Sequence, residues 1–149
     1  MSGLNKRLLL KNLEEGHIYY FLPTSTIGIP DHRHIFLKKS GEGMLIFSCC
    51  TSQQQTMEKL IAINGWSQST IVKLTPNKQN KLTTDTYINC NSPQIISPDD
   101  FLENYKRGNV TINNAEIDEV SFLAIENGII QSDLVDEETK DLFRMEVES

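Results

Sequence analysis

Arg33, Thr51 and Ser52 are the residues of this sequence whose types and spacing best suit chemistry on an anionic group. Arg33 begins one stretch of strand-forming residues, and Thr51 and Ser52 end the next such stretch. A guanidinium is always charged and holds two phosphate oxygens at once, while a hydroxyl donates one more hydrogen bond to such an oxygen. The three side chains can therefore bind a phosphate if the fold brings them together.

The residues between Arg33 and Thr51 predict a β-hairpin that would bring them together. The stretches IFLKK and MLIFSCC are rich in β-branched and aromatic residues, and the residues SGEG at 40–43 separate them as a turn. In an antiparallel hairpin the start of one strand lies beside the end of the next. We therefore expect Arg33, Thr51 and Ser52 to meet at one edge of a sheet, far from the turn.

Three histidines are candidates for moving a proton, because imidazole titrates near neutral pH. His32 and His34 flank Arg33, and His17 opens an earlier strand. Side chains alternate along a strand, so His32 and His34 are expected on the face opposite Arg33, unless His32 lies in the preceding loop. The three imidazoles also suggest a zinc site, but no Asp or Glu at a suitable spacing completes it, and no metal is expected.

Simpler structural roles also fit these residues. Arg33 can pair with Asp31 or Asp85 at the surface, where an ion pair adds little stability. Thr51 and Ser52 can end a strand, or cap the helix that the following residues predict. The residues themselves leave these alternatives open.

Hydrophobic periodicity and breakers predict further strands and helices around the hairpin. Strands are expected at 17–22, 69–75 and 86–90, with a short extended piece at 110–112. Helices are expected at 4–15, at about 56–64 before Gly65, from Ser97 to Gly108, from Asn113 or Asn114 to Gly128, and, acidic and peripheral, at 136–143. Because the strands are segregated from the helices, the expected class is α+β, mainly β with appended helices, forming a small barrel without free edges.

The length of 149 residues suits one domain with its own hydrophobic core. No apolar run is long enough to span a bilayer, and the first residues lack the apolar stretch of a signal peptide. These features predict a cytoplasmic protein with no membrane association. The three cysteines, an odd number without metal-type spacing, are expected to be reduced structural thiols.

Four segments, taken in order, resemble those of a known family. They are EGHIYYF at 15–21, HRHIFL at 32–37, SCCTSQ at 48–53, and LTTDTYI at 82–88 followed by 91–102. They are similar to the opening strand, the K-R-P strand, the strand ending in T-S/T/A-Q and the L-x-x-D-S segment with its helix in the MazF/PemK family of toxin endoribonucleases. The resemblance covers about residues 15–126.

This resemblance implies a small SH3-like antiparallel barrel and a growth inhibitor of a toxin–antitoxin system. Members of the family are homodimers restrained by an antitoxin protein, and they cleave single-stranded RNA without a metal or other cofactor, leaving a cyclic phosphate. The implied catalytic residues are Arg33, Thr51, Ser52 and His32. The implied RNA-binding residues are His17, His34, Gln53, Lys78 and Lys81. The two lysines also fit a solvated turn.

An alternative from a different functional class is a non-catalytic barrel that binds a nucleic acid or a protein. His34 stands where the family usually has proline after the arginine. The body of the chain is also nearly neutral, whereas RNA-binding surfaces are usually basic. Both features favour the alternative.

Negative charge is concentrated at the C-terminus. Residues 131–149 contain seven acidic and two basic residues, a net −5 out of −6, so residues 1–130 carry only about −1. We expect residues 1–130 to form the barrel domain with its N-terminal helix, and residues 131–149 to form an acidic helix or tail. This tail is expected to be solvated. A more specific alternative is that the tail competes with RNA for binding to the region of Arg33.

Overall fold

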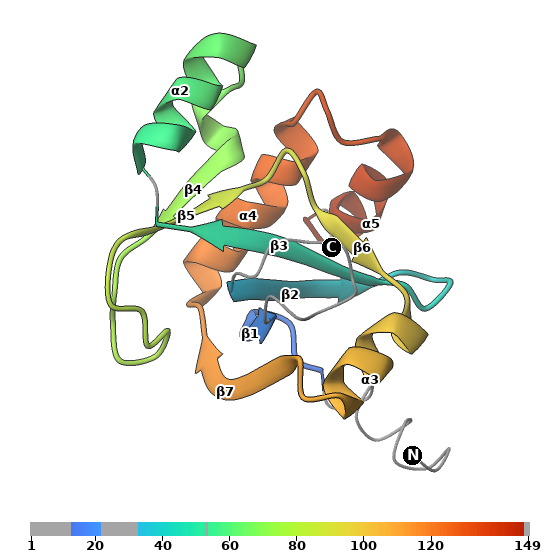
Figure 1. Cartoon of the computed structure of the whole chain (residues 1–149). Helices are drawn as coiled ribbons and strands as arrows, with labels where there is room; N and C mark the ends of the chain where they lie inside the picture. Colours follow the sequence, from blue (N-terminus) through green and yellow to red (C-terminus); the bar gives the residue numbers. More distant parts are fainter. Residues whose placement is uncertain (1–12, 22–32, 53, 148–149) are drawn as a thin grey trace.

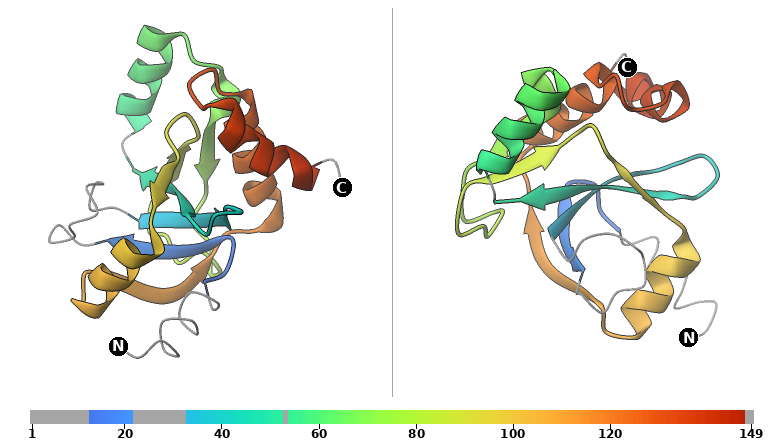
Figure 2. Two further views of the ribbon diagram at one scale, coloured as in Figure 1. Left: turned by 90° about the vertical axis from the view of Figure 1, so that its right-hand side faces the viewer. Right: turned by 45° about the horizontal axis from the view of Figure 1, so that its top comes forward.

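The computed structural model of this chain describes residues 13–21, 33–52 and 54–147 (Figure 1). In these ranges an antiparallel sheet curls into a half-barrel with four α-helices around it (Figure 2). The expected α+β class and antiparallel sheet are confirmed. Helices occupy more of the described chain than strands do, so the fold is mixed rather than mainly β. The helix expected at 4–15 lies almost wholly outside the described residues.

Seven strands of the described ranges form one sheet. The strands are β1 (His17–Phe21), β2 (Arg33–Lys39), β3 (Leu45–Thr51), β4 (Ile71–Leu74), β5 (Thr86–Asn89), β6 (Gln94–Ile96) and β7 (Val110–Glu116). Their order is β4-β5-β3-β2-β1-β7, β6 pairs with β3 beside β5, and every pairing is antiparallel. The β2–β3 hairpin therefore occupies the centre of the sheet.

Four α-helices and a short 3₁₀ turn complete the described fold. They are α2 (Gln54–Asn64), α3 (Pro98–Lys106), α4 (Glu119–Gln131), α5 (Glu137–Val147) and the turn η1 (Gln68–Thr70). The predicted positions of α2 and α3 are confirmed, and Ser97 caps α3 by accepting a hydrogen bond from the backbone N–H of Asp100 at 3.1 Å. No helix in these ranges is long and apolar enough to cross a bilayer.

The two faces of the sheet pack against different helices. On one face, Ile35 lies in a cluster with Ile129 of α4 and Phe143 of α5. On the other face, Phe47 stacks on Phe101 of α3 with ring centroids 5.9 Å apart. Figure 1 shows α4 and α5 on one side of the strands and α3 on the other. Each face of the curled sheet thus has its own core.

The predicted β2–β3 hairpin is confirmed. Its strands pair from His34, opposite Cys49, to the turn. In the turn, the backbone N–H of Ser40 donates to the carbonyl of Met44 at 2.9 Å, and Gly43 has a φ of +87°. Glycine adopts this conformation readily because glycine lacks a Cβ atom.

A β-bulge interrupts the pairing of β2 with β3. After Phe36, the next paired residue of β2 is Lys38, opposite Ile46, so Leu37 is an extra residue. Leu37 and Lys38 therefore face the same side of the sheet. Leu37 is buried in the core there, and the Nζ atom of Lys38 donates to the carbonyl of Leu142 in α5 at 2.6 Å.

The helix expected to begin at Asn113 or Asn114 begins later in the chain. Strand β7 continues to Glu116, and Asp118 caps α4 by accepting a hydrogen bond from the backbone N–H of Ser121 at 2.7 Å. The prediction was wrong because Asn and Asp are equally good caps, and pairing with β1 extends β7 past both asparagines.

Gly128, which was expected to end this helix, lies inside it. The helix continues to Gln131. A Cβ atom on Gly128 would lie 2.7 Å from the Sγ atom of Cys90 and 2.8 Å from the carbonyl oxygen of Ser69. The glycine therefore allows α4 to approach the end of β5 and the turn η1 closely.

Helix α5 is not peripheral, although its acidic composition suggested so. Phe143 is 0% exposed and lies in the same cluster as the central strands, together with Val135 in the preceding loop. Exposed Glu137 and Asp141 lie on the outer side, where Arg144 donates to them at 2.7 and 2.8 Å. The helix is amphipathic, and its apolar side completes the core.

Candidate functional site

The predicted phosphate-binding residues lie at the end of the sheet where β2 begins and β3 ends, which we call the Arg33 edge. Strand β1 ends and β5 begins at the same edge, since Arg33 pairs with Tyr20 and Thr51 pairs with Tyr87. Arg33 is exposed, Thr51 is half-buried, and Ser52 follows the strand and is exposed. Two other predicted site residues lie outside the described ranges, namely His32 and Gln53.

Arg33 and Thr51 lie on opposite faces at this edge. Because His34 pairs with Cys49, continuing the register sets Arg33 opposite Cys50. Thr51 is two positions from Cys49 and shares the face of that residue. The guanidinium therefore projects from the face of the sheet that packs against α4 and α5. The Thr51 hydroxyl projects from the opposite face, which packs against α3.

The bulge at Leu37 causes this separation. If the register at the turn, where Lys39 pairs with Leu45, continued without an extra residue, Arg33 would oppose Thr51 on one face. The bulge moves the pairing by one position, and a shift of one residue turns each side chain to the other face. Arg33 and Thr51 lie at the edge of the sheet that the sequence predicted. Because their side chains project from opposite faces, a phosphate can contact both only at the rim of the sheet.

The cysteines at this edge are not suited to nucleophilic chemistry. Burial raises the pKa of Cys50 far above its ordinary value, the neighbouring Cys49 raises it further, and the positive charge of Arg33 acts in the opposite direction. Burial also raises the pKa of Cys49 to about 11. Since the thiolate is the reactive form, both residues remain unreactive thiols near neutral pH.

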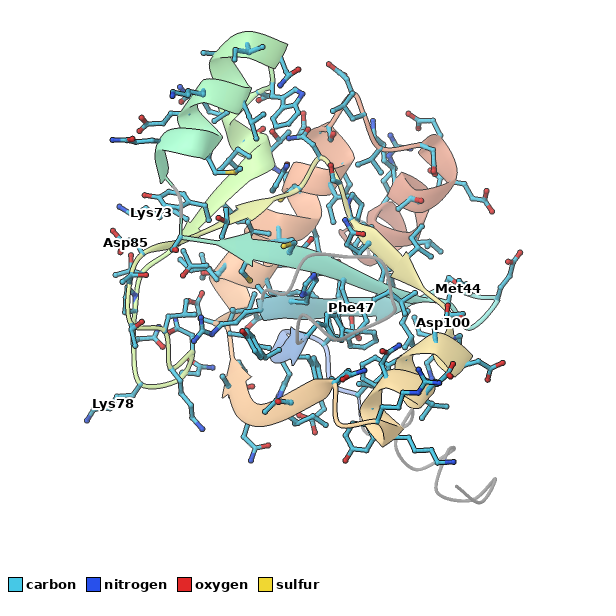
Figure 3. All side chains as sticks on the ribbon, in the orientation of Figure 1. Met44, Phe47, Lys73, Lys78, Asp85 and Asp100 are labelled. Carbon is cyan, nitrogen blue, oxygen red and sulfur yellow. The ribbon has the colours of Figure 1, made fainter. Side chains whose placement is uncertain are left out.

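Lys73 is a basic residue at this edge that was not identified from the sequence. It pairs with Tyr87 of β5, which pairs in turn with Thr51, so Lys73 and Thr51 share a face with Tyr87 between them. Its Nζ atom lies 3.4 Å from the Oδ2 atom of Asp85 (Figure 3). Asp85 is thus paired with Lys73, whereas the sequence had suggested Arg33. The missing signal was the pairing of β4 with β5, which the sequence does not specify.

The loop at 75–85 leaves the same edge and carries Lys78 and Lys81. Buried Asn80 organises it: its side chain donates to the carbonyl of Thr75 at 2.9 Å and accepts from the backbone N–H of Leu82 at 3.0 Å. Lys78 points away from the body of the protein (Figure 3). The loop therefore presents at least one cation in an ordered position.

His17 lies about 10 Å from the Arg33 edge, three positions along β1 from Tyr20. Its Nε2 atom lies 2.7 Å from the Oε2 atom of Glu14 and 3.2 Å from that of Glu116. These carboxylates hold the ring at the junction of β1 and β7. An RNA phosphate at this position would have to displace two negative charges.

His34 lies inside the protein. It is 0% exposed, and its ring centroid is 4.6 Å from that of Phe21. The sequence correctly predicted that it faces away from Arg33, but not that this face is a packed aromatic core. From this position the ring does not contact solvent, so an RNA-binding role would require it to act through its neighbours.

Within the described residues, no three His, Cys, Asp or Glu side chains form a group that could hold a metal ion. Arg33 instead presents an exposed guanidinium at the start of β2, a group that suits a phosphate, whereas Lys73 lies two strands beyond β3 and is paired with Asp85. No protein-family model matches this chain, and no curated protein is significantly similar to it.

Proposed function

We propose that this protein is a metal-independent endoribonuclease of the MazF/PemK type that cleaves single-stranded RNA. The observation that supports it most is the exposed guanidinium of Arg33 beside the strand end that carries Thr51 and Ser52. The four segments that resemble this family also lie on neighbouring elements, from β1, β2 and β3 to β5, β6 and α3. The proposal includes an SH3-like barrel, a homodimer and a restraining antitoxin.

The reaction uses a nucleophile that the substrate supplies. The 2′-oxygen of a ribose attacks the adjacent phosphorus, and the bond from phosphorus to the 5′-oxygen breaks. The 2′-hydroxyl loses a proton, and the leaving oxygen gains one. A 2′,3′-cyclic phosphate and a 5′-hydroxyl result. The protein has to stabilise a pentacoordinate phosphate and move two protons.

Arg33 is assigned to the phosphate, because its guanidinium binds two non-bridging oxygens and neutralises the charge that develops. Thr51 donates a hydrogen bond to the same group from the other side of the rim, and Ser52, just after the strand, donates another. His32 is assigned to proton transfer, since histidine is the residue type most often used for this task near neutral pH. Lys73 and the loop lysines, Lys78 and Lys81, hold the neighbouring phosphates of the strand.

The test is cleavage of a labelled single-stranded RNA in EDTA by the purified full-length protein. Arg33→Ala should lower the cleavage rate by about 10²-fold or more, as expected when a charged stabiliser of the transition state is lost. Lys39→Ala is the matched control, because Lys39 is an exposed cation on the same strand at the opposite end. Thermal unfolding of both variants should resemble that of the parent. Equal cleavage by both variants would contradict the proposal.

A second candidate is a non-catalytic domain that binds nucleic acid. The separation of Arg33 and Thr51 onto opposite faces favours it, because catalysis needs both groups on one phosphate. This candidate predicts that the protein binds RNA and that Arg33→Ala weakens binding, while no cyclic phosphate forms. Product analysis for 2′,3′-cyclic phosphate ends therefore separates the two candidates.

A further inference from the structure

A groove lies at the other end of the sheet, away from Arg33. It consists of two adjoining hollows of about 220 and 200 Å³ that share Ile95, Asp136 and Thr139 as lining residues. The groove runs from the turn after β5, past β6, to the β2–β3 turn, and the beginning of α5 forms its other wall. None of the residues proposed to bind RNA lines it.

Strand β6 offers backbone groups along this groove. It pairs with β3 on one side, and no strand in the described ranges pairs with its other side. Ile95 at its centre is 51% exposed, which is unusual for a large apolar side chain in the middle of a sheet strand. A strand edge that no described strand pairs with, beside hollows lined partly by apolar side chains, is the arrangement to which an extended peptide adds as a further strand.

The walls of the groove combine apolar and acidic side chains. Ile46 and Met44 from the hairpin line it together with Ile95. Glu42, Asp136 and Glu138 also line it, and the lining of both hollows includes no lysine or arginine.

The acidic character of the groove persists at neutral pH. The backbone N–H of Thr139 donates to Asp136 at 2.7 Å and holds the pKa of this carboxyl below its usual value, so Asp136 stays ionised. Lys38 lies on the same face of the sheet and brings a single positive charge near the groove, where its ammonium donates to the carbonyl of Leu142. The groove therefore combines apolar side chains with three carboxylates, Glu42, Asp136 and Glu138, which outnumber the nearby ammonium of Lys38.

We propose that this groove binds an extended segment of a partner protein with an apolar side chain and a lysine or arginine two residues from it. Alternate side chains of a strand point to the same face, so the apolar side chain enters the hollow at Ile95 as the cation reaches the carboxylates. This site is independent of the proposed nuclease activity, because it uses different residues at the opposite end of the sheet.

The probe is a fluorescein-labelled peptide, Thr-Lys-Thr-Leu-Thr-Lys-Thr, added to the full-length protein and followed by fluorescence anisotropy. Two matched peptides replace both lysines by glutamate or the leucine by serine. The lysine and leucine peptide should bind at least tenfold more tightly than either, and its affinity should fall as salt is raised. Equal binding of the three peptides, or no binding of the first at 1 mM, would overturn the proposal.

The variant Glu42→Gln with Glu138→Gln should weaken binding about threefold for each carboxylate removed, the change expected of one solvent-exposed ion pair. Glu119→Gln, which removes an exposed acid of α4 outside the groove, should leave affinity unchanged. Amide chemical shifts should move in β6 and at the start of α5, and shifts confined to other regions would contradict the proposed location. If Ile95→Lys instead converts a dimer to a monomer in sedimentation analysis, the groove binds a second copy of this chain and the peptide proposal fails.

Discussion

Among the glycines of the described ranges, Gly128 is the one at which an added Cβ atom would meet the closest contacts. A methyl group there would lie within 3 Å of both a sulfur and a backbone oxygen, and the backbone oxygen cannot turn aside. The clash is expected to cost about 3 kcal/mol, near the upper end for overpacking, against a gain of about 1 kcal/mol in helix propensity. Gly128→Ala should therefore lower the free energy of unfolding by about 2 kcal/mol, measured by urea denaturation.

Gly41→Ala is the control for this prediction. Gly41 lies in the β2–β3 turn, and no atom lies within 4 Å of the position its Cβ would occupy. Its substitution should change the free energy of unfolding by less than about 0.5 kcal/mol. A similar effect of the two substitutions would show that the contact of α4 with Cys90 and Ser69 is not close.

Individual residues also show what the sequence could and could not predict. The alternation of strand side chains correctly set His34 apart from Arg33, because alternation depends only on local backbone geometry. Gly128 was misread as the end of a helix, because its role depends on Cys90, which is remote in the chain. The buried state of His34 likewise depends on Phe21 of β1, whose ring packs in turn against Phe101 of α3.

Among the strands and helices, the bulge of β2 is the feature that could not be predicted from the sequence. Both strands and the turn between them follow from composition, so the edge holding Arg33 and Thr51 was predictable. An extra residue in a strand has no compositional signature here, because Leu37 simply continues the apolar run of Ile35 and Phe36. The face on which each candidate residue lies was therefore open until the register was known.

The N-terminal cap of α4 gives a prediction that depends on pH. Hydrogen bonds from Ser121, chiefly from its backbone N–H, hold the pKa of Asp118 below its usual value of 3.8. Because the folded-state pKa is the lower one, the carboxylate stabilises the fold fully above the unfolded value. That contribution is lost as pH falls through the folded value. Asp118→Ala should reduce the free energy of unfolding by about 1 kcal/mol at pH 7.

Urea denaturation at pH 7 and pH 3 tests this cap. The difference between the parent and Asp118→Ala should shrink at the lower pH, because pH 3 lies below the usual carboxyl pKa of 3.8 and part of the contribution is lost there. Asp118→Asn keeps an oxygen that accepts the hydrogen bond, so it should retain most of the stability at pH 7 and lose this titration. An undiminished difference at pH 3 would mean that the carboxylate charge is not what stabilises the helix start.

For the whole molecule, the C-terminal helix is part of the core although its composition resembles a solvated tail. Phe143→Ala removes a fully buried ring from the cluster that joins α5 to the sheet, and should cost about 3–5 kcal/mol in unfolding free energy. Leu134→Ala in the same segment is exposed and should cost less than about 0.5 kcal/mol. A small effect of Phe143→Ala would show that α5 is peripheral and contributes little to the core.

The hypothesis that this acidic segment competes with RNA is therefore better tested by charge than by deletion. Cutting the chain after Ser132 would remove Val135 and Phe143 from the core and expose apolar surface. Glu137→Gln with Asp141→Gln leaves the core intact, since both side chains are exposed. RNA affinity that does not change with these substitutions at low salt would leave the segment as a structural element.

The pairing of β1 with β7 has a consequence for how the protein is made. His17 and Glu116 are neighbours in the sheet, but 99 residues of chain separate their positions. At a ribosomal rate of about 5–20 residues per second, roughly 5–20 s pass between the synthesis of these two strands. During that interval the hairpin can form, while one side of β1 stays unpaired and open to other nascent chains. Slowing translation between these strands should therefore increase aggregation of the newly made protein.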